Sequence, residues 1–203
     1  MKNIKKLLSV ALALCMMSSF ATMASAAEIS TNGGSGYTPV NLTTTVDGSL
    51  DGEVVATAMS VTVPTALPMA MAQNGSVTTA SNCKITNHSY GAVRVASVTI
   101  TADQNWKLTA FGDKSTLAGA KVDSNQLGFA VSIGGGDVVC TNAGNTDTQT
   151  LIAAPIAGCY MTGAGDTSGN SVDIDYSAIV TPLSGAMTNS TIASVVFVVE
   201  WDT

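Results

Sequence analysis

The sequence predicts an all-β protein: a single β-sandwich, of jelly-roll or immunoglobulin-like wiring, preceded by a signal peptide and a flexible N-terminal segment. Two observations predict this class. Short runs of alternating apolar and polar residues recur along the chain, separated by turn residues every 8 to 12 positions or so. Only 11% of the residues are charged, and Ser, Thr, Asn and Gly supply the polarity, a mixture that disfavours long helices.

Residues 1–26 have the pattern of a secretory signal peptide. A lysine-containing start is followed by an apolar run at 7–17 and by small residues at 24–26, which place the cleavage after Ala26 or Ala27. The apolar run is too short to span a bilayer. We therefore expect a secreted protein, extracellular or associated with the cell surface, that does not insert into a membrane once the signal is removed.

Residues 27–52 are rich in Gly, Ser and Thr and are expected to form a flexible lead-in with one plausible strand at 40–46. The pattern changes at Glu53, so residues 53–203 are expected to form the sandwich domain. Strands are expected at 54–63, 67–72, 76–79, 83–87, 92–102, 106–111, 127–133, 138–140, 148–152, 172–180 and 192–201. The best helical candidate, 115–122, is long enough for about two turns.

Two local patterns refine the strand assignment. Asn74-Gly75 lies between two alternating segments and predicts a hairpin with a type I′ turn, because both residues tolerate positive φ. Pro64 and Pro68 cannot donate to a ladder, so 64–68 is expected to be an edge, a bulge or a crossover between sheets. In the clearest alternating run one face is expected to carry Val93, Val95, Ser97, Thr99 and Thr101, and the other Arg94, Ala96, Val98 and Ile100.

The charge of the mature chain argues against two classes of partner. Removing the signal leaves five cations against fourteen acidic residues, a net charge of −9. A nucleic-acid partner requires a clustered basic face, which the sequence lacks. Anionic membranes are disfavoured for the same electrostatic reason.

Three cysteines remain after processing: Cys83, Cys140 and Cys159. Export permits oxidation, and the odd count leaves at least one thiol over. A disulfide between Cys140 and Cys159 would close a Gly/Thr/Asn-rich loop and stabilise the fold by about 3 kcal/mol. The alternative is three separate buried thiols that pack as small apolar side chains.

The residues that catalysis usually needs are scarce. His88 is the single histidine and lies in a turn, so we expect it to face solvent. No G-x-S-x-G elbow, P-loop or dinucleotide fingerprint is present, and "GGG" at 134–136 reads as a turn. We expect no catalytic residues, no cofactor site and no enzyme activity.

The metal-binding patterns are incomplete. The widely spaced cysteines contain no C-x-x-C, which argues against zinc. Oxygen ligands for calcium are offered by Asp166, Ser168, Asn170, Asp173 and Asp175, but Ser171 and Ser177 replace the Gly and Glu of an EF-type loop. We expect no metal site.

The aromatic residues and the C-terminal strand bear on the core. Trp106 and Trp201 lie among apolar neighbours and are expected in the core, whereas a sugar-binding module would expose them or Tyr37, Tyr90 and Tyr160. The strand at 192–201 is very apolar and should be central, because an exposed edge of this kind would promote aggregation.

Two segments resemble a known group of proteins. They are "VTVPTALPMAMAQNGSVTTASNCKITNHSYGAVRVASVTI" and "ASVVFVVEWD". Over about 60–101 and 191–202 the chain resembles small secreted surface proteins of clostridial Gram-positive bacteria. It is more distantly similar to camelysin-type biofilm-matrix subunits, whose jelly-roll domains build fibres by giving a terminal strand to the next subunit. The resemblance implies a noncatalytic surface role and carries over no functional residue.

The leading functional expectation is therefore a noncatalytic cell-surface or extracellular-matrix protein, structural or adhesive, with self-assembly by strand addition. Expected partners are further copies of the chain, other surface or host proteins, or glycans. The first alternative is a carbohydrate-binding module. The second is a secreted hydrolase that uses paired carboxylates, which fourteen acidic residues would permit.

Overall fold

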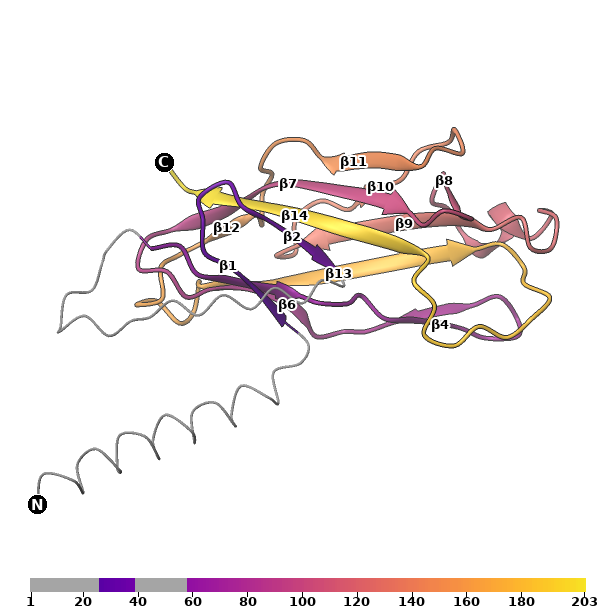
Figure 1. The fold of residues 1–203 in the computed structure, drawn as a ribbon, viewed down its shortest axis with the longest axis horizontal. Coiled ribbons are helices and arrows are strands. Elements are labelled where there is room, and N and C mark those ends of the chain that lie inside the picture. Colours follow the sequence, from indigo (N-terminus) through magenta and orange to yellow (C-terminus); the bar gives the residue numbers. More distant parts are fainter. Residues whose placement is uncertain (1–25, 39–57) are drawn as a thin grey trace, which may run out of the picture.

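The computed structural model describes residues 26–38 and 58–203, and it is all-β with antiparallel sheets (Figure 1). The expected strand at 40–46 and all of the expected signal peptide except Ala26 lie outside the described residues. Within the described part, the single helical element is the 3-10 turn η1, Lys114–Leu117, which begins after the capping carboxylate of Asp113. This short turn takes the place of the helix expected at 115–122.

Fourteen strands are formed in the described part of the chain. Their bounds are β1 Ala26–Ile29, β2 Ser35–Thr38, β3 Val61–Pro64, β4 Met69–Met71, β5 Val77–Thr79, β6 Cys83–Asn87, β7 Val93–Ala102, β8 Lys107–Thr109, β9 Gln126–Ile133, β10 Val139–Cys140, β11 Thr148–Ile152, β12 Tyr160–Met161, β13 Ser171–Val180 and β14 Ala193–Trp201.

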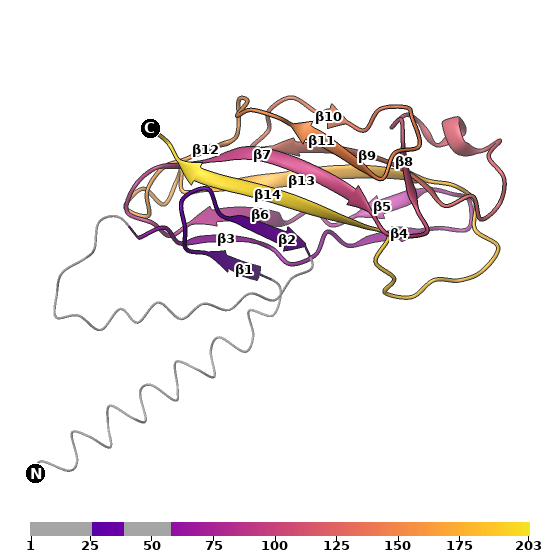
Figure 2. The same ribbon diagram turned by 45° about the horizontal axis from the view of Figure 1, so that its top comes forward.

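The strands form two larger sheets and one hairpin sheet. The seven-stranded sheet has the order β1-β3-β6-β13-β9-β10, with β8 added to β9 in the one parallel pairing. The five-stranded sheet has the order β11-β7-β14-β2, with β12 added to β7. Hairpin β4–β5 lies at the end of the molecule where β13 ends and the segment leading to β14 begins (Figure 2).

Buried side chains of both larger sheets belong to one hydrophobic cluster. Trp106 is buried in this cluster as expected, whereas Trp201 is only partly buried and packs against it. Strand β14 pairs with β7 on one side and β2 on the other, which confirms that the apolar C-terminal strand is central.

The first described segment differs from the flexible lead-in that its composition predicts. Strand β1 pairs with β3 in the seven-stranded sheet, and β2 pairs with β14 in the five-stranded sheet. The turn between them is held by backbone hydrogen bonds from Gly33 N to Val199 O (3.0 Å) and from Val199 N to Gly34 O (3.1 Å). These residues are ordered by pairing with strands distant in sequence. Such pairing cannot be recognised from their composition.

The alternation expected in β7 is broken by a bulge. Val93 and Val95 are buried, but the buried positions then become Val98 and Ile100. The pairing register with β14 shifts at this point, between Val198 and Val199. The extra residue turns Ser97, Thr99 and Thr101 away from the face that Val93 and Val95 share, so the prediction of one continuous face was wrong.

The hairpin expected at Asn74-Gly75 is confirmed, but the type I′ turn is not. Gly75 alone has positive φ, at 76°. Gly75 N donates to Ala72 O at 2.9 Å and Ala72 N donates to Ser76 O at 2.8 Å, which gives a three-residue loop with a glycine bulge. Asn74 Oδ1 accepts from Ser76 N at 3.0 Å and so stabilises this longer loop. The segment 64–68 crosses from β3 to the hairpin sheet, as predicted.

Candidate functional site

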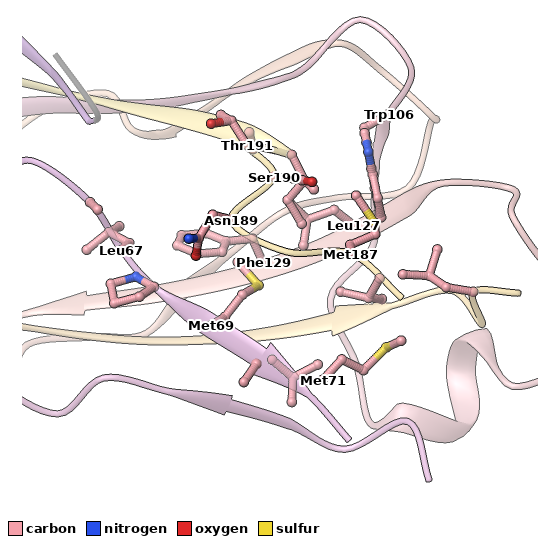
Figure 3. Close-up of a pocket in the computed structure, with 18 of the residues that line it drawn as sticks. Leu67, Met69, Met71, Trp106, Leu127, Phe129, Met187, Asn189, Ser190 and Thr191 are labelled. Atoms are coloured by element: carbon pink, nitrogen blue, oxygen red, sulfur yellow. The ribbon is translucent and has the colours of Figure 1, made fainter. Parts of the chain in front are cut away.

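A cavity of about 730 Å³ lies where hairpin β4–β5 meets the end of the core. Figure 3 shows its side chains converging from three sources: the hairpin with the residues before it, the ends of the core strands, and the segment 181–192 that leads into β14. Most of the lining is apolar. It includes Leu67, Met69, Met71, Trp106, Phe129 and Met187.

The cavity has a rigid floor and an adaptable rim. The floor is built from core side chains, since Trp106, Leu127 and Phe129 are all buried. Met69 and Met71 are partly buried on the hairpin, and Met187 is 46% exposed on the facing segment. Methionine is unbranched and polarisable, so it adapts to apolar ligands of varied shape. This composition suits an aliphatic or aromatic group, not a charged one.

The segment 181–192 is anchored at its start. The Asp123 carboxylate accepts hydrogen bonds from Ser184 N at 2.8 Å and Ser184 Oγ at 2.5 Å. The bond from the Ser184 hydroxyl, followed by that from its backbone, lowers the pKa of Asp123. Buried Thr181 Oγ1 accepts from Gln126 N at 3.1 Å. These contacts fix one end of the segment that covers the cavity.

Strand β14 reaches the cavity with one edge that the described residues of β2 cover only in part. Strand β2 pairs with Val195–Val198 and ends with Thr38 opposite Val195, while β7 pairing continues to Ala193. The backbone of Val199 bonds toward β2, and Ile192 O accepts from Asp103 N on the β7 side at 2.9 Å. Because successive residues of a strand point their N–H and C=O groups to opposite sides, those of Ala193 point toward the β2 side. Within the described residues, no strand pairs with Ala193 on that side.

The three cysteines do not come together. Cys83, Cys140 and Cys159 are free thiols, so the disulfide considered between Cys140 and Cys159 is not present in the structure. The alternative of three buried thiols also differs, because Cys140 is exposed, Cys83 is partly buried and Cys159 is fully buried. Burial raises the pKa of the Cys159 thiol and, against a hydrogen bond from Tyr176, that of Cys83.

His88 is exposed on the surface, as expected. Its Nε2 atom lies 2.9 Å from Thr62 Oγ1. Nearby, Ser60 Oγ donates to Glu28 at 2.8 Å. Among the described residues, the contact at the His88 ring is the hydroxyl of Thr62.

Two of the carboxylates considered for calcium, those of Asp166 and Asp173, have separate partners. Asp166 Oδ1 accepts from Ser168 N at 3.0 Å and Ser168 Oγ at 2.6 Å, and these bonds lower its pKa. Asp173 forms an exposed ion pair with Lys84 at 3.4 Å. Among the residues that the structure describes, no three His, Cys, Asp or Glu side chains are grouped so that they could hold a metal.

The aromatic residues divide between core and surface. Tyr90 is 74% exposed and Tyr160 is 48% exposed, whereas Trp106 is buried. Tyr160 lies opposite Arg94 in the β12–β7 pairing, and Arg94 pairs with Glu200 at 2.7 Å. The side chain of Tyr37 lies outside what the structure describes. These exposed tyrosines lie on strands and turns away from the cavity lining.

Sequence reasoning missed the cavity because its lining is assembled from distant segments. The nearest signal is "LPMAM", which places two methionines on one face of a short strand. Within residues 26–38 and 58–203, no helix is long and apolar enough to cross a membrane. Comparison with protein families, with curated proteins and with solved structures finds no match to this chain.

Proposed function

We propose that the chain is an exported, noncatalytic protein of the cell surface or extracellular matrix, structural or adhesive, that assembles by strand addition. The proposal includes a signal peptide at residues 1–26 and a β-sandwich of jelly-roll or immunoglobulin-like wiring. The shared core of the two larger sheets supports the sandwich. The resemblance to clostridial surface proteins, and more distantly to camelysin-type matrix subunits, belongs to the same proposal.

The observation that carries the proposal is the apolar cavity beside the edge of β14, which the described residues of β2 cover only in part. An extended segment placed along this edge would exchange backbone hydrogen bonds with Ala193, and alternate side chains would enter the cavity. Both gains are needed, because an unpaired backbone group and an exposed apolar surface each cost free energy. An apolar strand would both pair with the backbone of Ala193 and cover the apolar lining, whereas a small polar substrate would do neither.

The direct test is the association of the mature chain, expressed from Ala27. Size-exclusion chromatography with light scattering and negative-stain microscopy should show concentration-dependent oligomers or fibres. Met187→Asp places a charge at the cavity rim and should abolish assembly. Val138→Asp is the matched control, since Val138 is 64% exposed and lies outside the cavity lining, and should assemble as the unchanged chain does. A strictly monomeric wild-type chain at high concentration would contradict the proposal.

A carbohydrate-binding role has one specific observation in its favour, the exposure of Tyr90 and Tyr160. Sugar rings stack on exposed aromatic faces, and the phenol hydroxyl adds a polar contact. A glycan array should then give a signal that Tyr90→Ala or Tyr160→Ala removes. An array on which the unchanged chain binds nothing would eliminate this second candidate.

A further inference from the structure

We propose that hairpin β4–β5 is a hinged lid over the cavity and that the hydroxyl of Tyr176 is the latch that holds it closed. The inference deepens the proposed function and rests on it in one respect, because opening the lid would admit the added strand. The moving body is residues 65–82. Its two ends are fixed, since Pro64 ends β3 and Cys83 begins β6 in the seven-stranded sheet.

The segment 65–82 has few hydrogen bonds to the rest of the described chain. Strands β4 and β5 pair with each other and, among the described residues, with no strand of the larger sheets. The backbone hydrogen bonds of the hairpin loop stay inside the segment. Three hydrogen bonds join the segment to other described residues, of which two reach Tyr176 and one reaches Lys114. Opening the segment as a unit therefore breaks little of the backbone network.

The Tyr176 hydroxyl holds both ends of the hairpin at once. It donates to Pro68 O at 2.5 Å and accepts from Ala80 N at 3.2 Å. Pro68 directly precedes β4 and Ala80 directly follows β5, so one side chain closes both connections. Burial raises the pKa of the Tyr176 phenol, so at neutral pH the hydroxyl keeps the proton that it donates to Pro68 O.

The ring of Tyr176 is fixed in the core. The residue is buried, and its ring stacks on Phe129 with the ring centroids 6.0 Å apart. Its strand, β13, pairs with β9 on one side. On the other side, pairing between β13 and β6 begins at Cys83 opposite Ile174, so residues 80–82 leave the sheet beside Tyr176. The hairpin thus closes against a side chain that stays in place when the hairpin moves.

Both connections can act as hinges. Residues 65–68 and 80–82 form neither strand nor helix. A change of φ and ψ at a few such positions swings a packed element as a unit. On the first side Pro68 has a fixed φ and Thr65 is buried, which leaves residues 66–67 to rotate. On the second side the last two of the three residues are exposed and free of packing that would oppose rotation.

The hairpin forms one wall of the cavity. Met69 and Met71 lie on one face of β4 and, with Val77 of β5, line the cavity together with the buried floor (Figure 3). Met69 and Val77 are only partly buried and pack against the core cluster. These apolar contacts close the lid without fixing one geometry, because methionine side chains repack easily. Moving residues 65–82 outward would open the cavity to an incoming apolar strand.

The test measures how often a thiol inside the cavity becomes reactive. Cys83 and Cys140 are replaced by alanine, and Val195→Cys adds a thiol at a buried, cavity-lining position. Cys159 is kept as the internal reference, because it is fully buried and lies outside the cavity lining. The mature chain is treated with N-ethylmaleimide at low protein concentration, and peptide mass spectrometry gives the labelling rate of each thiol. When the lid closes faster than the reagent reacts, each rate is proportional to the population of the open form.

Tyr176→Phe removes both hydrogen bonds of the latch and keeps the ring. Labelling at Val195→Cys should rise about tenfold or more, while labelling at Cys159 should change by less than about twofold. The matched control is Ser89→Ala, because the buried Ser89 hydroxyl likewise accepts from one backbone N–H and donates to one backbone carbonyl, both of Ser60. This control should leave the ratio of the two labelling rates unchanged.

Equal acceleration of the two thiols, which global destabilisation would give, would overturn the inference, and so would no acceleration at Val195→Cys. A lid that opens in a chain that never oligomerises would support the inference and contradict the proposed assembly. A chain that assembles without the selective acceleration would overturn the lid alone, so the two failures can be told apart.

A second measurement keeps the inference testable if Tyr176→Phe folds poorly, because it leaves the latch intact. Lid opening exposes less surface than global unfolding, and the effect of urea scales with the surface exposed. In the Val195→Cys chain with Tyr176 unchanged, labelling at the new thiol should be faster than at Cys159 and should depend less steeply on urea. Equal rates and equal urea slopes at the two thiols would show that the cavity opens only by global unfolding, which would contradict the lid.

Discussion

The two ends of the molecule close by different means. At the end where β1 turns into β2, buried Asn87 donates from Nδ2 to Gly91 O and Thr162 O, both at 2.8 Å, and Ser89 N donates to its Oδ1 at 2.8 Å. At the other end, hairpin β4–β5 and the segment 181–192 surround the apolar cavity. In Figure 1 the end where β1 turns into β2 lies near the C-terminus, and β4 lies toward the other end.

The two ends therefore differ in how strongly their side chains define one conformation. Every polar group that the side chain of Asn87 offers has a defined partner, and a buried network of this kind favours one conformation because each broken bond leaves an unpaired group. The cavity end is built from methionines and from a segment held near its two ends, by Asp123 at Ser184 and by Asp103 N at Ile192 O. Its apolar lining specifies no single geometry. The polar end therefore holds one defined conformation, and under the proposed function the cavity end accepts an additional strand.

The largest expected effect is at the polar end. Asn87→Ala removes three side-chain hydrogen bonds and leaves the carbonyls of Gly91 and Thr162 without this donor. We expect a loss of about 4 kcal/mol in the free energy of unfolding. Urea denaturation measures it, with Gln104→Ala on an exposed turn as the control. A loss below about 1 kcal/mol would show that the network does not hold this end together.

A pair of glycine substitutions compares the two ends directly. A Cβ atom at Gly163, at the polar end, would lie 2.1 Å from Tyr90 O, whereas a Cβ at Gly185, beside the cavity, would meet nothing within 4 Å. Gly163→Ala should therefore cost about 3 kcal/mol, and Gly185→Ala should stay within about 0.5 kcal/mol of the unchanged chain. Thermal unfolding of the two variants is the measurement. Similar melting temperatures would remove the contrast in packing.

The flank opposite β1 and β2 gives a third, smaller effect. Thr141 is buried; its Oγ1 accepts from Phe129 N at 2.9 Å and donates to Thr109 O at 2.6 Å. Thr141→Val keeps the shape but leaves both backbone groups without this partner, which should cost about 2 kcal/mol. Thr148→Val, at an exposed position, is the control. If the two substitutions lower the free energy of unfolding equally, the hydroxyl of Thr141 does not stabilise this edge of the sheet.

The smallest effect concerns the anchor of the cavity segment. Hydrogen bonds from Ser184 hold the pKa of Asp123 below its unfolded value of about 3.9. The contact therefore stabilises the fold above that pH, and the contribution is lost as the pH falls through the folded pKa. The melting temperature of the unchanged chain should exceed that of Asp123→Asn at pH 6, and the gap should shrink as the pH falls below the unfolded value of about 3.9. A gap that does not change with pH would exclude this carboxylate as the anchor.

Much of the strand layout could be predicted from sequence, because alternation and turn residues are local signals. The hairpin around Asn74-Gly75 and the central position of β14 are examples. Strands β1 and β2 could not be predicted, since they lie in and beside a Gly-, Ser- and Thr-rich stretch that resembles a linker and their order comes from pairing with β3 and β14. The bulge in β7 could not be predicted either, because both expected faces of the strand carry apolar residues. Val93 and Val95 lie on one expected face, and Val98 and Ile100 lie on the other.

The cavity could not be predicted for a related reason. Trp106, Met69 and Met187 are far apart in sequence, and only the relative positions of the hairpin, β9 and the segment 181–192 bring them together. Each residue alone reads as ordinary core or surface.

Amide hydrogen exchange at Ala193, measured by NMR at a dilute and at an assembling protein concentration, tests most directly whether an added strand completes the cavity end. Ser194 is the internal reference, because its backbone points toward β7 and is paired with Thr101. We predict that protection of the Ala193 amide rises with protein concentration toward that of Ser194, and that Met187→Asp prevents the rise. An Ala193 amide that exchanges at the same rate at both concentrations while Ser194 stays protected would contradict the account.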